Sequence, residues 1–261
     1  MPLQTAEILR RTFVADVEHH VTLGSTNDLA KQYAADRRQP LPLLIVADEQ
    51  TAGRGRAANR WWTGRGSLAF SLLLSATALG IPRSRSPLVA LAAALAVVET
   101  AAPRLAGRTV GLHWPNDVYV EGRKLAGVLV ELLADGHCVV GIGVNTNHSL
   151  DDAPPELQSS AATLSDLTGT HHDHTDFLID VLARLDGLLH QIVNHPADIG
   201  RHADRMCLQR GQALTVAIAG RNVDGQCIGI GDDGCLLLDT TGGLRRIVSG
   251  VVRRGSQRET T

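Results

Sequence analysis

The sequence is most constrained where a short apolar run turns abruptly into a loop rich in glycine and arginine. Residues 43–47 predict a buried strand, because they are apolar without interruption. The following stretch, 48–62, interleaves two glycines with arginines and ends in two of the chain's three tryptophans. Glycine lets a backbone approach a ligand closely, and the planar guanidinium of arginine matches carboxylate and phosphate. A basic loop at the end of a rigid strand therefore predicts an anion site, although a solvated basic loop is the simpler alternative.

Composition places the chain among globular proteins without bulk affinity for nucleic acid. Its 261 residues suffice for one large domain, or for a medium domain with a small one. The net charge of -2 argues against a nucleic-acid surface. The N-terminus does not resemble a leader, and no stretch reaches membrane-spanning length without charge or glycine. We therefore expect a cytoplasmic protein without nucleic-acid or membrane partners, with its four cysteines reduced.

Lysine is nearly absent from this chain. Only Lys31 and Lys124 occur, and arginine supplies the other basic residues. Arginine cannot replace lysine where a compact ammonium group is required. Each remaining lysine is therefore a candidate for a specific role.

The hydrophobic pattern predicts an α+β fold followed by a small β domain. A meander of antiparallel strands covers 110–144, and a helix that is apolar nearly all round covers 88–100. Four short apolar runs separated by glycine turns follow residue 211, which predicts a small barrel or sandwich. We place the domains at 1–208 and 209–261. Further helices are expected at 5–14, 29–36, 175–193 and up to about 209, and further strands at 17–23 and 67–75.

Two polar elements lie within the meander. Trp114-Pro115-Asn116-Asp117 interrupts it, and proline should let the last two side chains turn away from the strand pairing. An Asx turn is the plain alternative, and a site for Mg²⁺ and phosphate is the functional one. Lys124 begins the returning strand, where an edge lysine is the plain alternative. The hairpin should bring Lys124 back beside Asp117, where an ammonium group can neutralise charge that develops on a phosphate.

A third polar element precedes the apolar strand. Ser25-Thr26-Asn27 stands before the predicted helix, so Ser25 or Thr26 should cap it. A hydroxyl in that place can also contact a ligand.

Five elements, in the same order, resemble those of biotin protein ligases. They are Ser25-Thr26-Asn27, Gly53-Arg54-Gly55-Arg56 with Arg60-Trp61, His113-Trp114-Pro115-Asn116-Asp117, Lys124-Leu125-Ala126-Gly127-Val128-Leu129, and Gly141-Ile142-Gly143-Val144-Asn145. The resemblance covers about residues 20–145. Within it, the sequence departs from the family at two positions. Asn59 stands where an arginine is frequent, and His113 stands where lysine is usual.

The resemblance implies a fold and an activity. The fold is a mixed or antiparallel sheet of the class II synthetase kind, with helices mainly on one face and a C-terminal SH3-like barrel. The activity is an ATP-dependent ligase that forms biotinoyl-5′-adenylate and then biotinylates a lysine of a carboxyl carrier domain, with Mg²⁺ as the metal. It also implies the form without an N-terminal DNA-binding domain, and a loop 53–66 that a ligand orders. An exposed sheet edge could mediate a homodimer, which the sequence does not decide.

The resemblance also implies roles for individual residues. Catalysis is assigned to Lys124, Arg56 and Asp117, and Asp117 is assigned to Mg²⁺. Biotin contacts are assigned to Ser25, Thr26, Asn27, Gln50, Gly53, Arg54, Lys124 and Gly127. Nucleotide contacts are assigned to Arg54, Arg56, Trp61, His113, Asn116, Asp117, Lys124 and Asn145.

Two rival functions and two motif matches were weighed. A lipoate or octanoyl transferase shares the fold but lacks the glycine/arginine loop, and a biotin-sensing module would not need Lys124 and Asp117. The run 229–234 matches G-x-G-x-x-G, but a strand follows it, so a hairpin turn is the better interpretation. The histidines of 171–174 lack a partner cluster for a metal.

Overall fold

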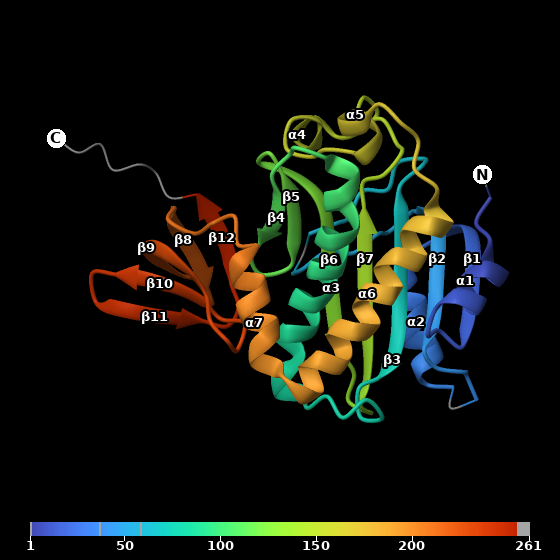
Figure 1. Cartoon of the computed structure of the whole chain (residues 1–261), viewed down its shortest axis with the longest axis horizontal. Coiled ribbons are helices and arrows are strands. Elements are labelled where there is room, and N and C mark those ends of the chain that lie inside the picture. Colours follow the sequence, from blue (N-terminus) through green and yellow to red (C-terminus); the bar gives the residue numbers. More distant parts are fainter. Residues whose placement is uncertain (1, 37, 58, 255–261) are drawn as a thin grey trace.

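The computed structural model describes residues 2–36, 38–57 and 59–254, and it contains two sheets (Figure 1). The larger sheet has seven strands in the order β1-β2-β3-β7-β6-β5-β4. Its strands are β1 Asp16–Leu23, β2 Leu43–Gln50, β3 Leu68–Ser75, β4 Val110–His113, β5 Asp117–Val120, β6 Arg123–Leu132 and β7 His137–Val144. Only β1 and β2 run parallel, so the predicted mixed sheet is confirmed.

Helices cover mainly one face of this sheet, as predicted (Figure 1). The helices are α1 Thr5–Arg11, α2 Thr26–Ala34, α3 Ser86–Ala101, α4 Pro155–Gln158, α5 Leu164–Thr168, α6 His174–Asn194 and α7 Pro196–Arg205. Helices α3 and α6 pack on each other over one face, and the main core lies beneath them. On the other face α2 covers β2, β3 and β7 with a smaller apolar cluster that includes Ile45 and Leu73. The rest of that second face is available for a site.

One helical stretch is long and apolar enough to cross a membrane by length and composition. It runs from Arg83 to Leu105, and 72% of its most apolar window is buried inside the fold. The stretch comprises α3 and the short 3₁₀ turns Arg83–Arg85 and Ala102–Leu105. It forms the centre of the main core, as expected for a helix that is apolar nearly all round.

The second sheet lies beyond α7 and has the order β11-β10-β9-β8-β12. Its strands are β8 Ala213–Ile218, β9 Arg221–Ile230, β10 Leu236–Thr240, β11 Gly243–Ile247 and β12 Val251–Arg254. The four predicted strands are present, and β12 was missed because it is a four-residue strand that pairs with the distant β8. Within the described residues β11 and β12 remain the two edges, so the SH3-like barrel is not confirmed. The domain boundary near residue 208 stays a prediction.

Several element ends differ from the prediction for local reasons. Strand β2 continues to Gln50, because Glu49 and Gln50 still pair with Thr22 and Leu23 of the parallel β1. Asp117 does not turn away from the pairing but begins β5, opposite His113 and Gly127. Residues 155–158 form the short helix α4, which is not among the elements expected from the sequence.

Two histidines, His148 buried and His174 partly buried, fasten the segment after the glycine/arginine loop. His148 is 2% exposed, and its Nδ1 lies 3.0 Å from Ser67 Oγ. The amide of Asn147 donates to His174 Nε2 at 3.0 Å. Burial lowers the pKa of both imidazoles to about 4. Both rings are therefore neutral in the folded protein near pH 7.

We predict that stability falls as the pH drops from about 6.5 towards 4. In that window the unfolded chain binds protons that the folded chain does not, so protonation favours unfolding. For each histidine whose pKa is lowered by this amount, protonation removes up to ~3 kcal/mol from the free energy of unfolding. Urea unfolding of wild type and His148→Gln at pH 7 and 5 tests this. The variant should lose less stability between the two pH values, while His190→Gln, at a residue 66% exposed, should behave as wild type. Equal losses in all three proteins would contradict the prediction.

Candidate functional site

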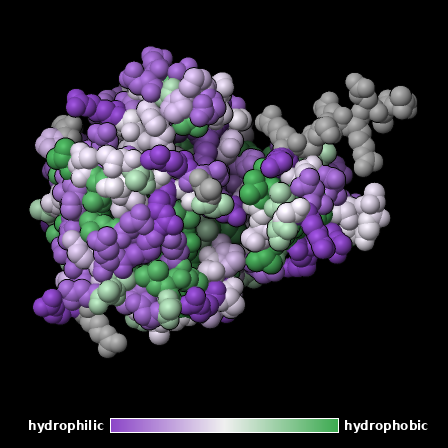
Figure 2. Space-filling model, turned by 180° about the vertical axis from the view of Figure 1, so that it is seen from behind, coloured by the Kyte–Doolittle hydropathy of each residue, from purple (hydrophilic) through white to green (hydrophobic). Residues whose placement is uncertain are grey.

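A cavity of about 260 Å³ opens on the second face of the large sheet. Its walls come from the start of α2, the glycine/arginine loop, the strands β5–β7 and the C-terminal strand β12. Viewed from behind, the surface is hollowed where the two sheets meet (Figure 2). The site is therefore built between segments that are far apart in the sequence.

Glycines form the floor of this cavity. Gly127 on β6 pairs with Gly143 on β7, and Gly141 lies two residues along β7 on the same face. A Cβ on Gly143 would lie 2.2 Å from Trp61 Cε2, and one on Gly141 would lie 1.9 Å from Asn27 Oδ1. The floor thus lets the indole of Trp61 and the amide of Asn27 lie directly on the sheet.

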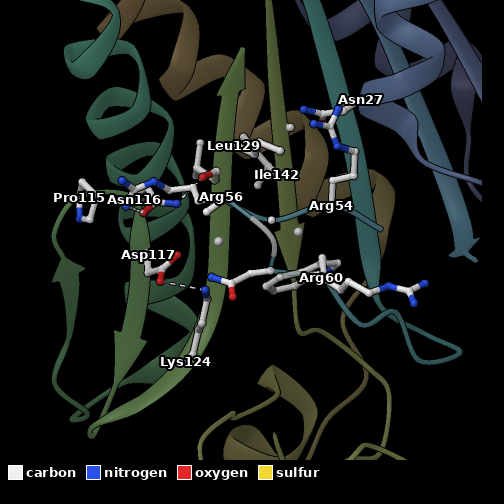
Figure 3. A pocket seen from close by; sticks show the side chains of 18 of the residues that line it. Asn27, Arg54, Arg56, Arg60, Pro115, Asn116, Asp117, Lys124, Leu129 and Ile142 are labelled. Atoms are coloured by element: carbon white, nitrogen blue, oxygen red, sulfur yellow. Dashed lines mark hydrogen bonds and ion pairs between the residues drawn. The ribbon is translucent and has the colours of Figure 1, made fainter. Parts of the chain in front are cut away.

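An ion pair lies at one end of the floor. Lys124 Nζ is 2.8 Å from Asp117 Oδ2, as the hairpin predicted, and 5.7 Å from the centre of the Trp61 ring (Figure 3). A Cβ on Gly127 would come within 3.2 Å of both charged groups. The other carboxylate oxygen, Asp117 Oδ1, is buried and has no hydrogen-bond partner within the described residues. The pair can therefore offer a cation and a free acceptor to a ligand.

The opposite end of the cavity is neutral and hydrogen-bonded. Gln50 Oε1 accepts from the backbone N–H of Thr26 at 2.8 Å and from its hydroxyl at 3.2 Å. The hydroxyl of Ser71 lies 2.7 Å from Thr26 Oγ1 and 2.6 Å from Asn27 Oδ1. Ser25 occupies the N-cap position of α2, but its side chain makes no capping bond, and Thr26 does not cap the helix either. The prediction of a side-chain cap is wrong, because the Thr26 hydroxyl is directed to Gln50.

The first two arginines of the loop diverge (Figure 3). Arg54 Nη1 lies 2.8 Å from Asp28 Oδ1 and 3.1 Å from Glu131 Oε1. Arg56 instead donates to Asn116 Oδ1 and to the carbonyl of Gly250, both at 3.2 Å. Within the described residues Arg56 forms no ion pair with a carboxylate.

The pKa values of Arg54 and Arg56 are shifted in opposite directions. Burial acts against the charge of Arg54, but the carboxylates of Asp28 and Glu131 raise its pKa. Burial lowers the pKa of Arg56, and the charge of Asp117 opposes this only in part. Of these two arginines, Arg56 therefore has the less neutralised charge and is better suited to an anionic ligand.

The Trp114–Asp117 element is held by the C-terminal part of the chain. The backbone N–H of Trp114 donates to Gln209 Oε1 at 2.6 Å, and its indole N–H donates to the carbonyl of Gly234 at 2.9 Å. Asn116 Nδ2 donates to the carbonyl of Val128 at 2.5 Å, which directs the amide oxygen to Arg56. The second sheet thus fixes one wall of the site.

The structure brings most of the predicted site residues together. All of them line the cavity except Gly53 and Asn145. Gly53 lies behind the wall, against the backbone of Trp61. Asn145 supports the site from behind, because its Nδ2 donates to the carbonyl of Lys124 at 3.1 Å. His113 stacks on Tyr119 with ring centres 4.6 Å apart.

Other residues of the site were missed from the sequence. Ser71 and Glu131 are polar residues with apolar neighbours on both sides in their strands, which is a signal that could have found them. Gly141 and Gly143 had no signal beyond the motif itself. Val251 and Val252 line the cavity from β12, whose approach depends on the tertiary fold.

Comparison with known proteins agrees with this geometry. A family model described as "Biotin/lipoate A/B protein ligase family" matches residues 20–147. The bifunctional ligase/repressor BirA of Bacillus subtilis is 31% identical over 243 residues, which cover 91% of this chain and 73% of that protein. The biotin--[acetyl-CoA-carboxylase] ligase of Mycobacterium tuberculosis is 32% identical over 229 residues, which cover 87% of this chain and 84% of that protein.

Solved structures give the same result. The biotin protein ligase from Aquifex aeolicus in complex with biotin and ATP superposes with a TM-score of 0.80 at 28% identity, covering 92% of this chain and 100% of that chain. The fold and the site therefore define a protein ligase of the biotin/lipoate class. The chain belongs to this family, and the relatives named above are its biotin ligases.

We predict that Gly143→Ala displaces Trp61 without unfolding the protein. The new Cβ would overlap the indole, and the indole belongs to a loop that can shift more easily than the sheet. Tryptophan fluorescence should move towards the red relative to wild type, and Trp61→Phe should remove the difference between the two backgrounds. Gly187→Ala on helix α6 is the matched control, because its Cβ would meet nothing within 4 Å. An unchanged spectrum for Gly143→Ala would contradict the prediction.

Proposed function

We propose that this protein is an ATP-dependent biotin protein ligase. In this reaction biotin is first converted to biotinoyl-5′-adenylate and then transferred to a lysine side chain of a carboxyl carrier domain. The observation that carries the proposal is that the two ends of one cavity differ in charge. A neutral hydrogen-bonding cradle lies at one end, and Lys124, Asp117 and Arg56 lie at the other. Relatives with this fold include a structure solved with biotin and ATP.

The neutral end suits the ureido ring of biotin. That ring carries two N–H donors and one carbonyl acceptor, and it has no charge. Thr26, Asn27 and Gln50 offer hydroxyl and amide groups that can both donate and accept. Hydrogen bonds between Thr26 and Gln50, and from Ser71 to Asn27, hold these groups in place before a ligand arrives, which reduces the entropy lost on binding.

The charged end suits the first reaction step. A carboxylate oxygen of biotin forms a bond to the α-phosphorus of ATP, the bond from that phosphorus to the bridging oxygen breaks, and pyrophosphate leaves. Negative charge accumulates around the phosphorus, where Lys124 and Arg56 supply positive charge from a partly buried site. Positioning and charge neutralisation are the main demands, because no covalent enzyme intermediate is needed.

The donor set fits Mg²⁺ through a single protein ligand. Asp117 Oδ1 is a buried carboxylate oxygen without a partner in the described part of the chain. No group of three or more histidine, cysteine or acidic side chains that could hold a metal ion was found among those residues. This pattern suits Mg²⁺, which is usually held by one or two carboxylates together with substrate phosphates and water. The ion would supply positive charge to the phosphates.

The second step transfers the biotinoyl group to an amine. The lysine nitrogen of the carrier forms a bond to the acyl carbon, the bond from that carbon to the phosphate oxygen breaks, and AMP leaves with the electron pair. The attacking amine must lose a proton during this step. The opening between the two sheets gives a carrier side chain a route to the cavity (Figure 2).

The function is tested by mass spectrometry of a purified apo carrier domain. After incubation with the protein, biotin, ATP and Mg²⁺, the carrier should gain the mass of one biotinoyl group, and omission of ATP should abolish the gain. A gain with lipoate in place of biotin would indicate a lipoate ligase. Binding of biotin without any gain, on several carriers, would indicate a biotin-sensing module.

We predict that Lys124→Ala reduces adenylate formation by a factor of about 10² to 10³, the range for loss of one transition-state donor. The fold should persist, because Lys124 lies at a cavity wall and not in the core. Pyrophosphate release measures the rate, and thermal unfolding measures the fold. Arg108→Ala is the control, because it removes a cation that pairs with Glu121 outside the cavity. A rate within threefold of wild type, or an unfolded variant, would contradict the prediction.

We predict that Arg56→Gly releases the adenylate faster than wild type does. The guanidinium that would contact the phosphate is lost, and charged hydrogen bonds of this kind contribute ~1.5–3 kcal/mol each. Free adenylate in a filtrate, measured by chromatography after one turnover without carrier, reports the leakage. Arg60→Gly is the control: Arg60 also lines the cavity, but its guanidinium extends away from Lys124 and Asp117 and donates to the carbonyl of Thr51 (Figure 3). Equal leakage from the two variants would count against the assignment.

A further inference from the structure

Glu131 lies behind the cavity and contacts two of its walls, the start of α2 and the glycine/arginine loop. It follows Gly127 and Leu129 on the same face of β6, so its side chain emerges beside the neutral end of the floor. The side chain is 21% exposed and does not itself line the cavity. No role in the reaction above uses it.

The carboxylate of Glu131 has three partners. Oε2 accepts from Asn27 Nδ2 at 2.9 Å and from Arg54 Nη1 at 3.3 Å. Oε1 lies 3.1 Å from Arg54 Nη1 and 3.3 Å from Lys31 Nζ. The contact with Asn27 fixes the orientation of its amide. The contacts with Arg54 and Lys31 neutralise these two cations.

The orientation of the Asn27 amide matters for a ligand. With Nδ2 held by Glu131, Oδ1 is turned to the cavity floor, where it meets the hydroxyl of Ser71 and stands over Gly141. Either orientation of an amide fills the same space, so shape alone does not select one. The carboxylate selects it, because a carboxylate accepts hydrogen bonds and cannot donate them.

The cations form a closed set with two carboxylates. Lys31 Nζ lies 2.7 Å from Asp28 Oδ1, which is also the oxygen that Arg54 contacts. Burial acts to raise the pKa of Asp28, but hydrogen bonds from Lys31 and Arg54 lower it overall. Arg54, in the loop that was expected to be ordered by a ligand, therefore already has protein carboxylates as partners.

We propose that Glu131 is a positioning residue that couples the ureido end of the cavity to the glycine/arginine loop. Oε2 orients Asn27 for biotin, and the whole carboxylate fastens the loop through Arg54 before the ligand binds. Lys31 assists by neutralising the shared carboxylates. This inference rests on the proposed function for the identity of the ligand, while the anchoring of the loop stands on the contacts alone.

Three variants separate the two actions of Glu131. In Glu131→Gln the amide oxygen can still accept from Asn27, but the charge that holds Arg54 and Lys31 is lost. In Glu131→Ala both are lost. In Asp28→Asn only the charge that Asp28 provides to the loop anchor is lost. Glu121→Gln is the matched control, because it removes the partner of Arg108 at 2.8 Å, in a pair outside the cavity.

The orienting role of Glu131 towards Asn27 is tested by the KM for biotin, measured from steady-state pyrophosphate release. We expect Glu131→Ala to raise the KM for biotin about tenfold with a smaller change in kcat, since a hydrogen bond to a charged group is lost. Glu131→Gln should restore the KM to within about twofold of wild type. An unchanged KM in Glu131→Ala, or an equal rise in both variants, would overturn the orienting role.

The anchoring of the loop is tested by limited trypsin digestion of the ligand-free protein. The loop arginines at positions 54, 56, 60 and 65 are the cleavage sites. First cuts in this segment should appear about threefold faster in Glu131→Gln, Glu131→Ala and Asp28→Asn, as expected for loss of partly exposed ion pairs. Glu121→Gln should be cut as wild type is. Equal rates in all proteins would overturn the anchoring role.

The wild-type protein separates this inference from the proposed function. If wild type shows no biotin-dependent release of pyrophosphate, the proposed function fails, and the digestion still decides whether Glu131 anchors the loop. If wild type is active but the variants behave as the control does, the inference alone fails. Thermal unfolding of each variant confirms that a change in KM or in cleavage does not come from global unfolding.

Discussion

The site depends on a part of the sheet that carries no side chains. Gly127, Gly141 and Gly143 lie on adjacent strands of the uncovered face, and each supports a different functional group. Strand pairing fixes this floor rigidly, since the backbone groups beneath it are already hydrogen-bonded within the sheet. A side chain at Gly141 or Gly143 would push Asn27 or Trp61 away from the sheet. The cavity therefore exists because the floor is bare.

The charges around this floor fall into two groups with different consequences. At one end, Arg54 and Lys31 are neutralised by Asp28 and Glu131, so this end presents mainly neutral hydrogen-bonding groups. At the other end, Lys124 has one carboxylate partner, while Arg56 is held by neutral oxygens. Charges in a partly buried site interact more strongly than in water. The cavity is thereby polarised along its length, which suits a ligand that is neutral at one end and anionic at the other.

The second sheet contributes to the site by holding backbone in place. The carbonyls of Gly234 and Gly250 accept from Trp114 and Arg56, and the linker residue Gln209 accepts from the backbone of Trp114. Gln209 is only 1% exposed, so breaking its bond would leave a buried N–H unpaired. The catalytic wall is thus stabilised from outside the large sheet, although no charged group of the second sheet reaches the cavity floor in the described residues.

The sequence alone determined the class of fold, the order of nearly all elements and most of the residues that line the site. It could do so because hydrophobic period, turn residues and compact motifs are local properties. The hairpin from Asp117 to Lys124 is short, so even that ion pair followed from the sequence. Three features follow only from the tertiary structure. Arg54 and Arg56 bind different partners, and β12 pairs with β8. Ser71 and Glu131 support the neutral end of the cavity. These features join residues dozens of positions apart, and their partners are selected by the packing of whole elements, which no local pattern records.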